Sequence, residues 1–163
     1  MRYSEKTDCN YNLCIAIANA FLEIGKESNE YDRIAQSSDM LFHDDAFYAF
    51  PAIVNTALSC ELYLKAEILA SPSCSNVPQE HFLMDLFRKL PNEKRYALCQ
   101  EYIRRRKNQS ELEETFLIHS DSFRQWRYAF EKDKTFFIEA CPDNLILAAE
   151  VLRDDLENRE RML

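Results

Sequence analysis

The segment DDAFYAFPAIVNTALSCELYLKAEILA, residues 44–70, is the longest helical pattern in the chain. Its apolar residues recur at intervals of three and four, which is the spacing of one face of an α-helix. Pro51 lies within the first two turns of the pattern, where it marks either a kink or the true start of the helix. We therefore expect one long helix over about residues 44–70.

The composition of the 163 residues excludes several other folds. The chain has a single glycine, Gly25, whereas dinucleotide-binding folds, phosphate-binding loops and multi-stranded sheets need glycine for tight turns and close backbone approach. Hydrophobic residues make up 47% and charged residues 29%, which is typical of a globular chain. We expect one all-α domain over residues 1–163, an up-and-down bundle of five to seven helices.

The other patterns place the remaining helices of this bundle. A helix over about residues 9–24 is expected to end at Gly25, because glycine commonly terminates helices. Ser110, with Glu113 three residues later, resembles a capping box that opens a long helix to about residue 132. Further helices are expected over residues 29–36, 79–90, 92–107 after Pro91, and from Pro142 to the C-terminus, with residues 135–140 the one segment that could be extended.

The charge balance disfavours two classes of partner. The chain carries 20 Lys and Arg against 28 Asp and Glu, a formal net charge of −8. Phosphate-neutralising proteins usually carry the opposite balance, so we expect neither broad DNA binding nor attachment to an anionic membrane. The basic run over residues 104–107 is the one local exception.

The sequence favours a cytoplasmic protein with reduced thiols. No stretch reaches the roughly 18 apolar residues of a spanning helix. Residues 13–22 resemble a signal peptide, but their apolar stripe continues past the possible cleavage site, so we interpret them as part of the first helix. The six cysteines include no C-x-x-C pair and the three histidines are scattered, so we expect mostly buried thiols, no metal site and no cofactor.

Two charged residues lie on the apolar face of the long helix. At 100° per residue, with Val54 at 0°, the apolar residues span about 300° through 0° to 60°. Glu61 and Lys65 fall at about 340° and 20°, in the middle of this arc. They are one turn apart in the favourable order for an ion pair. Both side chains are therefore expected to be buried.

The helix expected after Ser110 repeats this feature. With Phe123 at 0°, His119 and Arg127 fall on the apolar stripe at about 320° and 40°. Glu131 lies at its edge, near 80°. Two helices thus each direct ionisable groups toward a face that should be dry.

Buried charges need partners, and two interpretations remain open. In the first, the charges form a structural brace in which Glu61 pairs with Arg127 and Lys65 with Glu131. In the second, they line a polar cleft between two helices, which is a common place for ligand sites in helical bundles. Neither interpretation specifies a chemistry.

Three segments of the chain combine the motifs E-x-x-x-K-A, H-x-x-x-D-L and W-R-Y-x-x-E: ALSCELYLKA (57–66), HFLMDLFRKLP (81–91) and FRQWRYAFE (123–131). In this combination they resemble a branch of the HEPN family. Such proteins are small helical bundles, often homodimers, and are frequently encoded beside toxin–antitoxin or anti-phage systems. From this resemblance we expect the same fold and a homodimer for this chain.

One departure from the family concerns catalysis. HEPN ribonucleases carry an arginine followed, after four to six residues, by a histidine, and no arginine here is followed by a histidine at that distance. The resemblance therefore implies a non-catalytic member, without catalytic residues of its own. We expect it to bind a nucleotide, an RNA or a partner protein. A divergent metal-independent ribonuclease and a purely structural dimerisation bundle are the alternatives.

If the cleft is functional, the resemblance and the residue chemistry together suggest individual roles. Arg127 would bind a phosphate or carboxylate, with Arg124 as a more exposed helper. His81 or His119 would titrate near neutral pH. His81 also begins an expected helix, where a capping role is the alternative. The candidate binding residues are therefore Glu61, Lys65, His81, His119, Arg124, Arg127 and Glu131.

Overall fold

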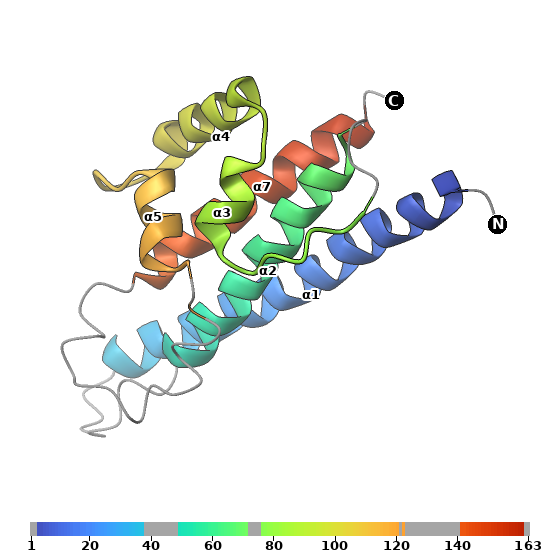
Figure 1. Cartoon of the computed structure of the whole chain (residues 1–163). Helices are drawn as coiled ribbons and strands as arrows, with labels where there is room; N and C mark the ends of the chain where they lie inside the picture. Colours follow the sequence, from blue (N-terminus) through green and yellow to red (C-terminus); the bar gives the residue numbers. More distant parts are fainter. Residues whose placement is uncertain (1–2, 38–48, 72–75, 121, 123–140, 162–163) are drawn as a thin grey trace.

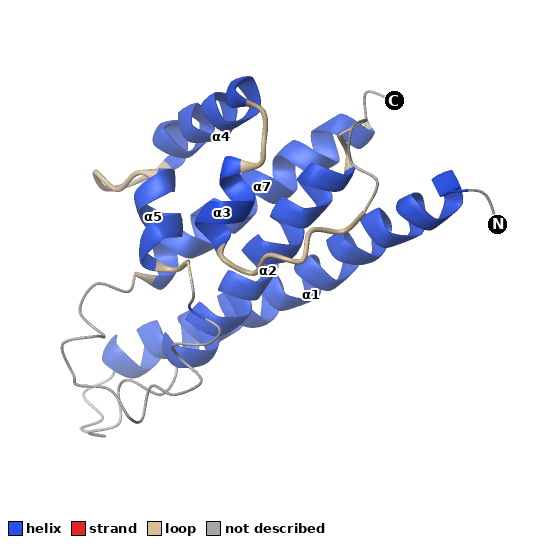
Figure 2. Cartoon of the chain, viewed as in Figure 1, coloured by secondary structure: helices blue, strands red, loops and turns tan. Residues whose placement is uncertain are grey.

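The computed structural model describes residues 3–37, 49–71, 76–120, 122 and 141–161, and within these ranges all regular secondary structure is helical (Figure 2). This confirms the prediction of an all-α fold for the part of the chain that is described. The helices are α1 (Tyr3–Ser37), α2 (Ala49–Leu69), α3 (Leu83–Arg88), α4 (Asn92–Arg105), α5 (Leu112–Ile118) and α7 (Pro142–Glu160).

The three long helices, α1, α2 and α7, lie side by side, and the short helices cover the side of α2 and α7 that faces away from α1 (Figure 1). Helices α1 and α2 run antiparallel, whereas α7 runs in the same direction as α2 (Figure 1). The short helices α3, α4 and α5 come between α2 and α7 in the sequence. The long helices therefore do not alternate strictly up and down.

Helix α1 continues through Gly25, so the prediction that it ends there is wrong. A Cβ atom at this position would clash with the Thr56 hydroxyl oxygen and would lie 3.2 Å from the carbonyl oxygen of Ala52. Glycine is present here because α1 and α2 approach closely, not because the helix needs a terminator. The helices predicted over 9–24 and 29–36 are consequently one helix of 35 residues.

Helix α2 is the centre of the structure. It begins at Ala49, so Pro51 lies in its first turn, where a missing N–H costs no intrahelical hydrogen bond. Every residue from 63 to 69 is buried, which means that α2 is enclosed on all sides at this level. Its neighbours are α1 on one side, α7 beside it, and α3 across the core.

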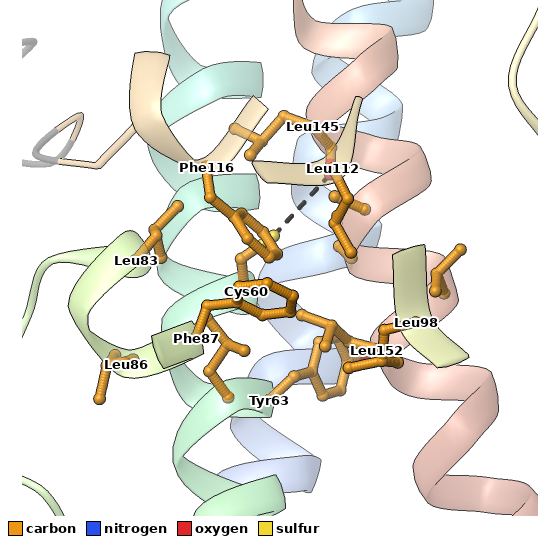
Figure 3. Close-up of a cluster of buried hydrophobic side chains, with 14 of the residues drawn as sticks. Cys60, Tyr63, Leu83, Leu86, Phe87, Leu98, Leu112, Phe116, Leu145 and Leu152 are labelled. Carbon is orange, nitrogen blue, oxygen red and sulfur yellow. Dashed lines mark hydrogen bonds between the residues drawn. The ribbon is translucent and has the colours of Figure 1, made fainter. Parts of the chain in front are cut away.

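The hydrophobic core lies between α2, α7 and the short helices (Figure 3). The rings of Phe87 in α3 and Phe116 in α5 pack with their centroids 5.2 Å apart and tilted by 57°. The thiol of Cys60 points into this core and donates to the carbonyl oxygen of Leu145 at 3.8 Å (Figure 3). Burial raises the pKa of this thiol, as expected for a structural cysteine.

Helix α5 is shorter than predicted at both ends. Its N-cap is Glu111, without a side-chain capping bond, so the capping box expected from Ser110 and Glu113 does not form. Ser110 instead bonds the hydroxyl of Tyr102 at 3.0 Å and donates to the side chain of Asn108. The helix ends at Ile118, and the prediction of one helix from 110 to 132 is therefore wrong. The expected extended segment over 135–140 lies outside the described residues.

The other helices lie where they were predicted, but the predicted ranges of α3 and α4 were too long. Helix α3 covers only part of the predicted 79–90, and α4 starts directly after Pro91, as expected. Helix α7 begins at Pro142, which was also expected. In the described ranges, no helix is long and apolar enough to cross a membrane.

Candidate functional site

Glu61 and Lys65 form a buried ion pair within α2. The ammonium group of Lys65 donates to Glu61 Oε1 at 2.8 Å, and the two side chains are only 9% and 11% exposed. The prediction that both would be buried is confirmed. The reason differs from the predicted one, because α2 buries its whole circumference here rather than a single apolar arc.

His81 joins this pair from the connection between α2 and α3. Its Nδ1 lies 2.9 Å from Glu61 Oε1, the same oxygen that accepts from Lys65. A carboxylate only accepts hydrogen bonds, so Nδ1 carries the proton and Nε2 is the nitrogen left for other contacts. The His81 side chain is 77% exposed. We call Glu61, Lys65 and His81 the Glu61 cluster: two buried charges that hold one exposed imidazole.

Parts of the chain distant in sequence meet at the Glu61 cluster. The connection that follows α2 passes back across α2 before α3 begins (Figure 1). In this connection Glu80 accepts from Lys89 at 2.5 Å, and this bond is the main reason why the pKa of Glu80 is lowered. On the α1 side, burial raises the pKa of the Cys14 thiol, and the positive charge of Lys65 opposes that shift.

His119 has a structural role and does not change its charge near neutral pH. It is buried at the end of α5, and its Nδ1 lies 3.2 Å from the Ser122 hydroxyl. Burial lowers the pKa of His119 to about 4, so the imidazole is neutral at pH 7. Of the two histidines proposed as alternatives for titration near neutral pH, His119 is therefore excluded. The projection did not reveal that the helix ends there in a buried turn.

The turn after His119 anchors α3, and through it the neighbouring His81. The Leu83 N–H donates to the carbonyl oxygen of Ser120 at 3.2 Å, and the Met84 N–H donates to the Ser120 hydroxyl at 3.3 Å. These N–H groups belong to the first turn of α3, which has no capping side chain from its N-cap, Phe82. His81 therefore does not cap α3; its side chain binds Glu61 instead.

The other candidate residues, Arg124, Arg127 and Glu131, lie outside the described residues. The predicted pairs of Glu61 with Arg127 and of Lys65 with Glu131 therefore stay predictions. Among the described residues, Glu61 binds both Lys65 and His81.

The sequence analysis missed a second ionic cluster, near the C-terminal end of α2. We call Glu67, Lys94, Asp155 and Arg159 the Glu67 cluster. Arg159 of α7 donates to Glu67 Oε2 at 2.7 Å, and Lys94 of α4 lies 3.5 Å from the same oxygen. Lys94 also binds Asp155 of α7. The cluster thus joins three helices.

Glu67 itself is fully buried, and its environment is not ideal for a charge. Its second oxygen, Oε1, has no hydrogen-bond partner. Burial, together with the nearby Asp155, raises the pKa of Glu67 to about 7, although Lys94 and Arg159 oppose this shift. On the helical projection Glu67 falls at about 220°, outside the apolar arc, and this is why the sequence analysis did not single it out.

The basic run at the end of α4 is bound within its own chain. Arg104 donates to Glu101 at 2.6 and 2.8 Å, and Arg105 donates to Glu101 and to Asp154 of α7. Arg106 donates to backbone carbonyl oxygens of residues 109 and 110. The bond from Arg104 is the main cause that lowers the pKa of Glu101 to about 2. Three of the four basic residues are thus already engaged.

Metal and disulfide chemistry receive no support from the described side chains. Within the described ranges, no group of three or more His, Cys, Asp or Glu side chains could hold a metal ion. The cysteines whose side chains are described, Cys14, Cys60, Cys99 and Cys141, are free thiols. No protein-family model, curated protein or solved structure matches this chain.

Proposed function

We propose that this chain is a non-catalytic, HEPN-like helical module that binds the terminal phosphate of a nucleotide or an RNA at the Glu61 cluster. Two of the three segments that resemble the HEPN family, 57–66 and 81–91, contribute to this cluster. Glu61 and Lys65 are the charged residues of the motif E-x-x-x-K-A, and His81 opens the motif H-x-x-x-D-L.

The observation that carries the proposal is the exposed His81 imidazole held by the buried Glu61 carboxylate. A group held by a buried partner loses little conformational freedom when it meets a ligand. A protonated imidazole donates from both nitrogens, from Nδ1 to Glu61 and from Nε2 to a phosphate oxygen. Lys65 neutralises Glu61. A cluster with a protonated imidazole therefore carries one net positive charge, which attracts an anion.

Two features favour binding over catalysis. General acid–base cleavage of RNA needs a proton donor and a proton acceptor near the scissile bond. The chain lacks the arginine–histidine motif of the family's ribonucleases, and His119, with a pKa of about 4, is buried and neutral.

The bonds of Arg104, Arg105 and Arg106 within the chain limit the proposal to a terminal phosphate, because a long nucleic acid needs many free cations.

The resemblance adds the biological setting to the proposal. It favours a homodimer encoded with a toxin–antitoxin or anti-phage system, and the pattern of cysteines favours the cytoplasm. None of these features is needed for the binding chemistry of the Glu61 cluster.

Fluorescence anisotropy with a labelled RNA octamer tests the binding proposal. One octamer carries a 5′-monophosphate and its control a 5′-hydroxyl. We expect the full chain to bind the phosphorylated octamer more tightly, and His81→Ala to raise the Kd at least tenfold. Gln79→Ala is the matched control, since Gln79 is an exposed residue of the same connection whose side chain binds only a nearby carbonyl oxygen. Its Kd should equal that of the unchanged protein.

Three results would contradict the proposal. If the two octamers bind equally, or if His81→Ala binds as the unchanged protein does, the cluster is not a phosphate site. If the unchanged protein does not bind at all, the cluster is only a structural brace. If it cleaves the octamer on a denaturing gel and His81→Ala does not, the divergent ribonuclease replaces the binding module.

A further inference from the structure

Among the described residues, helix α1 packs on the other helices through one of its faces. It lies at the edge of the molecule and packs on α2 and α7 (Figure 1). Its buried residues recur every three or four positions: Ala18, Leu22, Gly25, Asn29 and Asp32. The opposite face of the helix therefore points away from the core.

This outward face is apolar, where a solvent-facing helix surface is normally polar. Seven consecutive positions at alternating spacings of four and three are exposed, and five of them are large apolar residues that are 38–63% exposed. That spacing is the heptad pattern of a coiled-coil seam. We call this set the outer seam: Leu13, Ile17, Ala20, Ile24, Glu27, Tyr31 and Ile34.

One edge of the outer seam is acidic. Glu23 and Glu30 flank it, with side chains 61% and 63% exposed, and Glu27 lies within it. The other edge carries Phe21 and Ser28 and has no charge. In a coiled coil these flanking positions choose the partner by charge.

The basic residues beside this edge are shared with other acids and neutralise it only in part. Arg153 of α7, for example, lies 4.0 Å from Glu23 but 3.1 Å from Asp154. Lys26 lies closer to Glu150 of α7, at 3.1 Å, than to the flanking acid on its own helix, at 3.8 Å. Arg33 likewise lies 2.9 Å from Asp143 of α7 and 3.8 Å from its flanking acid. Each cation is therefore shared between a flanking acid and a closer acid of α7, so the edge keeps part of its negative charge.

We infer that the outer seam docks an amphipathic helix with Lys or Arg along one flank, supplied by another protein. The seam covers 22 residues, about 30 Å or three heptads, which is long enough for a helix-to-helix interface. A second copy of this chain is a poorer occupant. In an antiparallel pair each acidic edge would face its own copy, and the two chains each carry a net charge of −8.

Synthetic three-heptad peptides test this inference with the full chain. The first peptide has Leu and Ile at the seam positions and Lys at the flanks, the second has Glu at the flanks, and the third is a scrambled form of the first. We expect the basic peptide to bind at least tenfold more tightly than the other two. Its affinity should fall as salt is added, because exposed charges are screened.

Variants of the chain locate the binding. Ile24→Glu should weaken binding of the basic peptide at least tenfold, whereas Tyr96→Glu, an equally apolar-to-acidic change at a 67% exposed position of α4, should leave it unchanged. The double variant Glu23→Lys/Glu30→Lys alters only exposed flanks and so should keep the fold. It should reverse the preference from the basic to the acidic peptide.

The inference fails if the scrambled peptide binds as well as the basic one, or if the charge-reversed variant keeps the original preference. Sedimentation velocity tests whether a second copy of this chain occupies the outer seam instead. A dimer that dissociates in Ile24→Glu but not in Tyr96→Glu would show that a second copy covers the outer seam, and this would also overturn the inference.

Discussion

The two ionic clusters of α2 lie six residues apart and are built differently. In the Glu61 cluster, a lysine from the same helix neutralises the buried carboxylate, and the third member is an imidazole that is 77% exposed. In the Glu67 cluster, the carboxylate is fully buried and its partners come from α4 and α7. One cluster presents a group to solvent, whereas the other joins three helices.

We interpret this difference as that between the proposed binding site and a structural brace. A buried charge is costly unless it is paired, so both clusters must be satisfied by the fold. Glu67 keeps one oxygen without a partner and can take up a proton, since its pKa is raised to about 7. Within the described part of the chain, Glu61 Oε1 accepts from Lys65 and binds His81. The predictions below test this contrast.

The largest effect is expected for Lys65→Met, which keeps the volume but removes the charge. It leaves Glu61 buried with only an exposed imidazole as partner, and breaking a buried pair in this way costs about 3–5 kcal/mol of the free energy of unfolding. Urea denaturation followed by circular dichroism measures the loss. The double variant Glu61→Gln/Lys65→Met should lose clearly less, because it leaves no unpaired charge. Equal losses in both would contradict a buried ion pair.

The next effect is a pH dependence that belongs to Glu67. Its pKa is about 7 in the folded state and 4.5 ordinarily, so between these values the native state binds more protons than the unfolded state. The free energy of unfolding then falls as pH rises from 4.5 to 7, by about 3 kcal/mol from this group. Glu67→Gln cannot titrate. Its stability relative to the unchanged protein should therefore increase over this range, and parallel curves would contradict the assignment.

His119 changes the free energy of unfolding with pH in the opposite direction to Glu67. Its pKa falls from 6.5 to about 4 on folding, so the unfolded state binds more protons between these values. Stability from this group rises with pH across that window and is lost as pH falls toward 4. In the unchanged protein the two contributions offset each other, and the comparison with Glu67→Gln separates them.

A smaller effect is expected for Lys94→Met, the same substitution in the Glu67 cluster. Glu67 keeps Arg159 at 2.7 Å and can also protonate, so the loss should be about 1 kcal/mol. The measurement is the same urea denaturation at pH 6. This pH is below the pKa of Glu67, so a proton on Glu67 compensates for the lost lysine charge. A loss as large as that of Lys65→Met would remove the contrast between the two clusters.

The smallest effect on stability is expected for His81→Ala. The imidazole is largely exposed, and exposed ion pairs contribute about 0–1 kcal/mol, so thermal unfolding should change little. Glu61 keeps its bond to Lys65 in this variant. A loss of several kcal/mol would instead make His81 part of the structural brace.

The sequence predicts which segments are helical better than it predicts where each helix begins and ends. The helical patterns locate all of the described helices, and the positions of Glu61 and Lys65 on an apolar face correctly predict their burial. Gly25 shows the limit of this approach. A glycine that ends a helix and one that allows another helix to approach look the same in a sequence, and only the position of Thr56 distinguishes them.

The site shows a second limit. A helical projection assumes one buried face, so it cannot identify Glu67 on a helix that is buried all round. It also assumes that a helix continues, and therefore placed His119 on a stripe that ends at Ile118. His81 was named as a candidate, but its contact with Glu61 spans 20 residues and depends on the path of the connection after α2.

The most direct test of the central claim is the nitrogen spectrum of the histidine rings during a titration with adenosine 5′-monophosphate. The chain has only three histidines, and His119 serves as the buried internal control. If the Glu61 cluster binds phosphate, the Nε2 resonance of His81 shifts with the ligand while that of His119 stays in place. A His81 resonance that does not move at millimolar nucleotide would contradict the account.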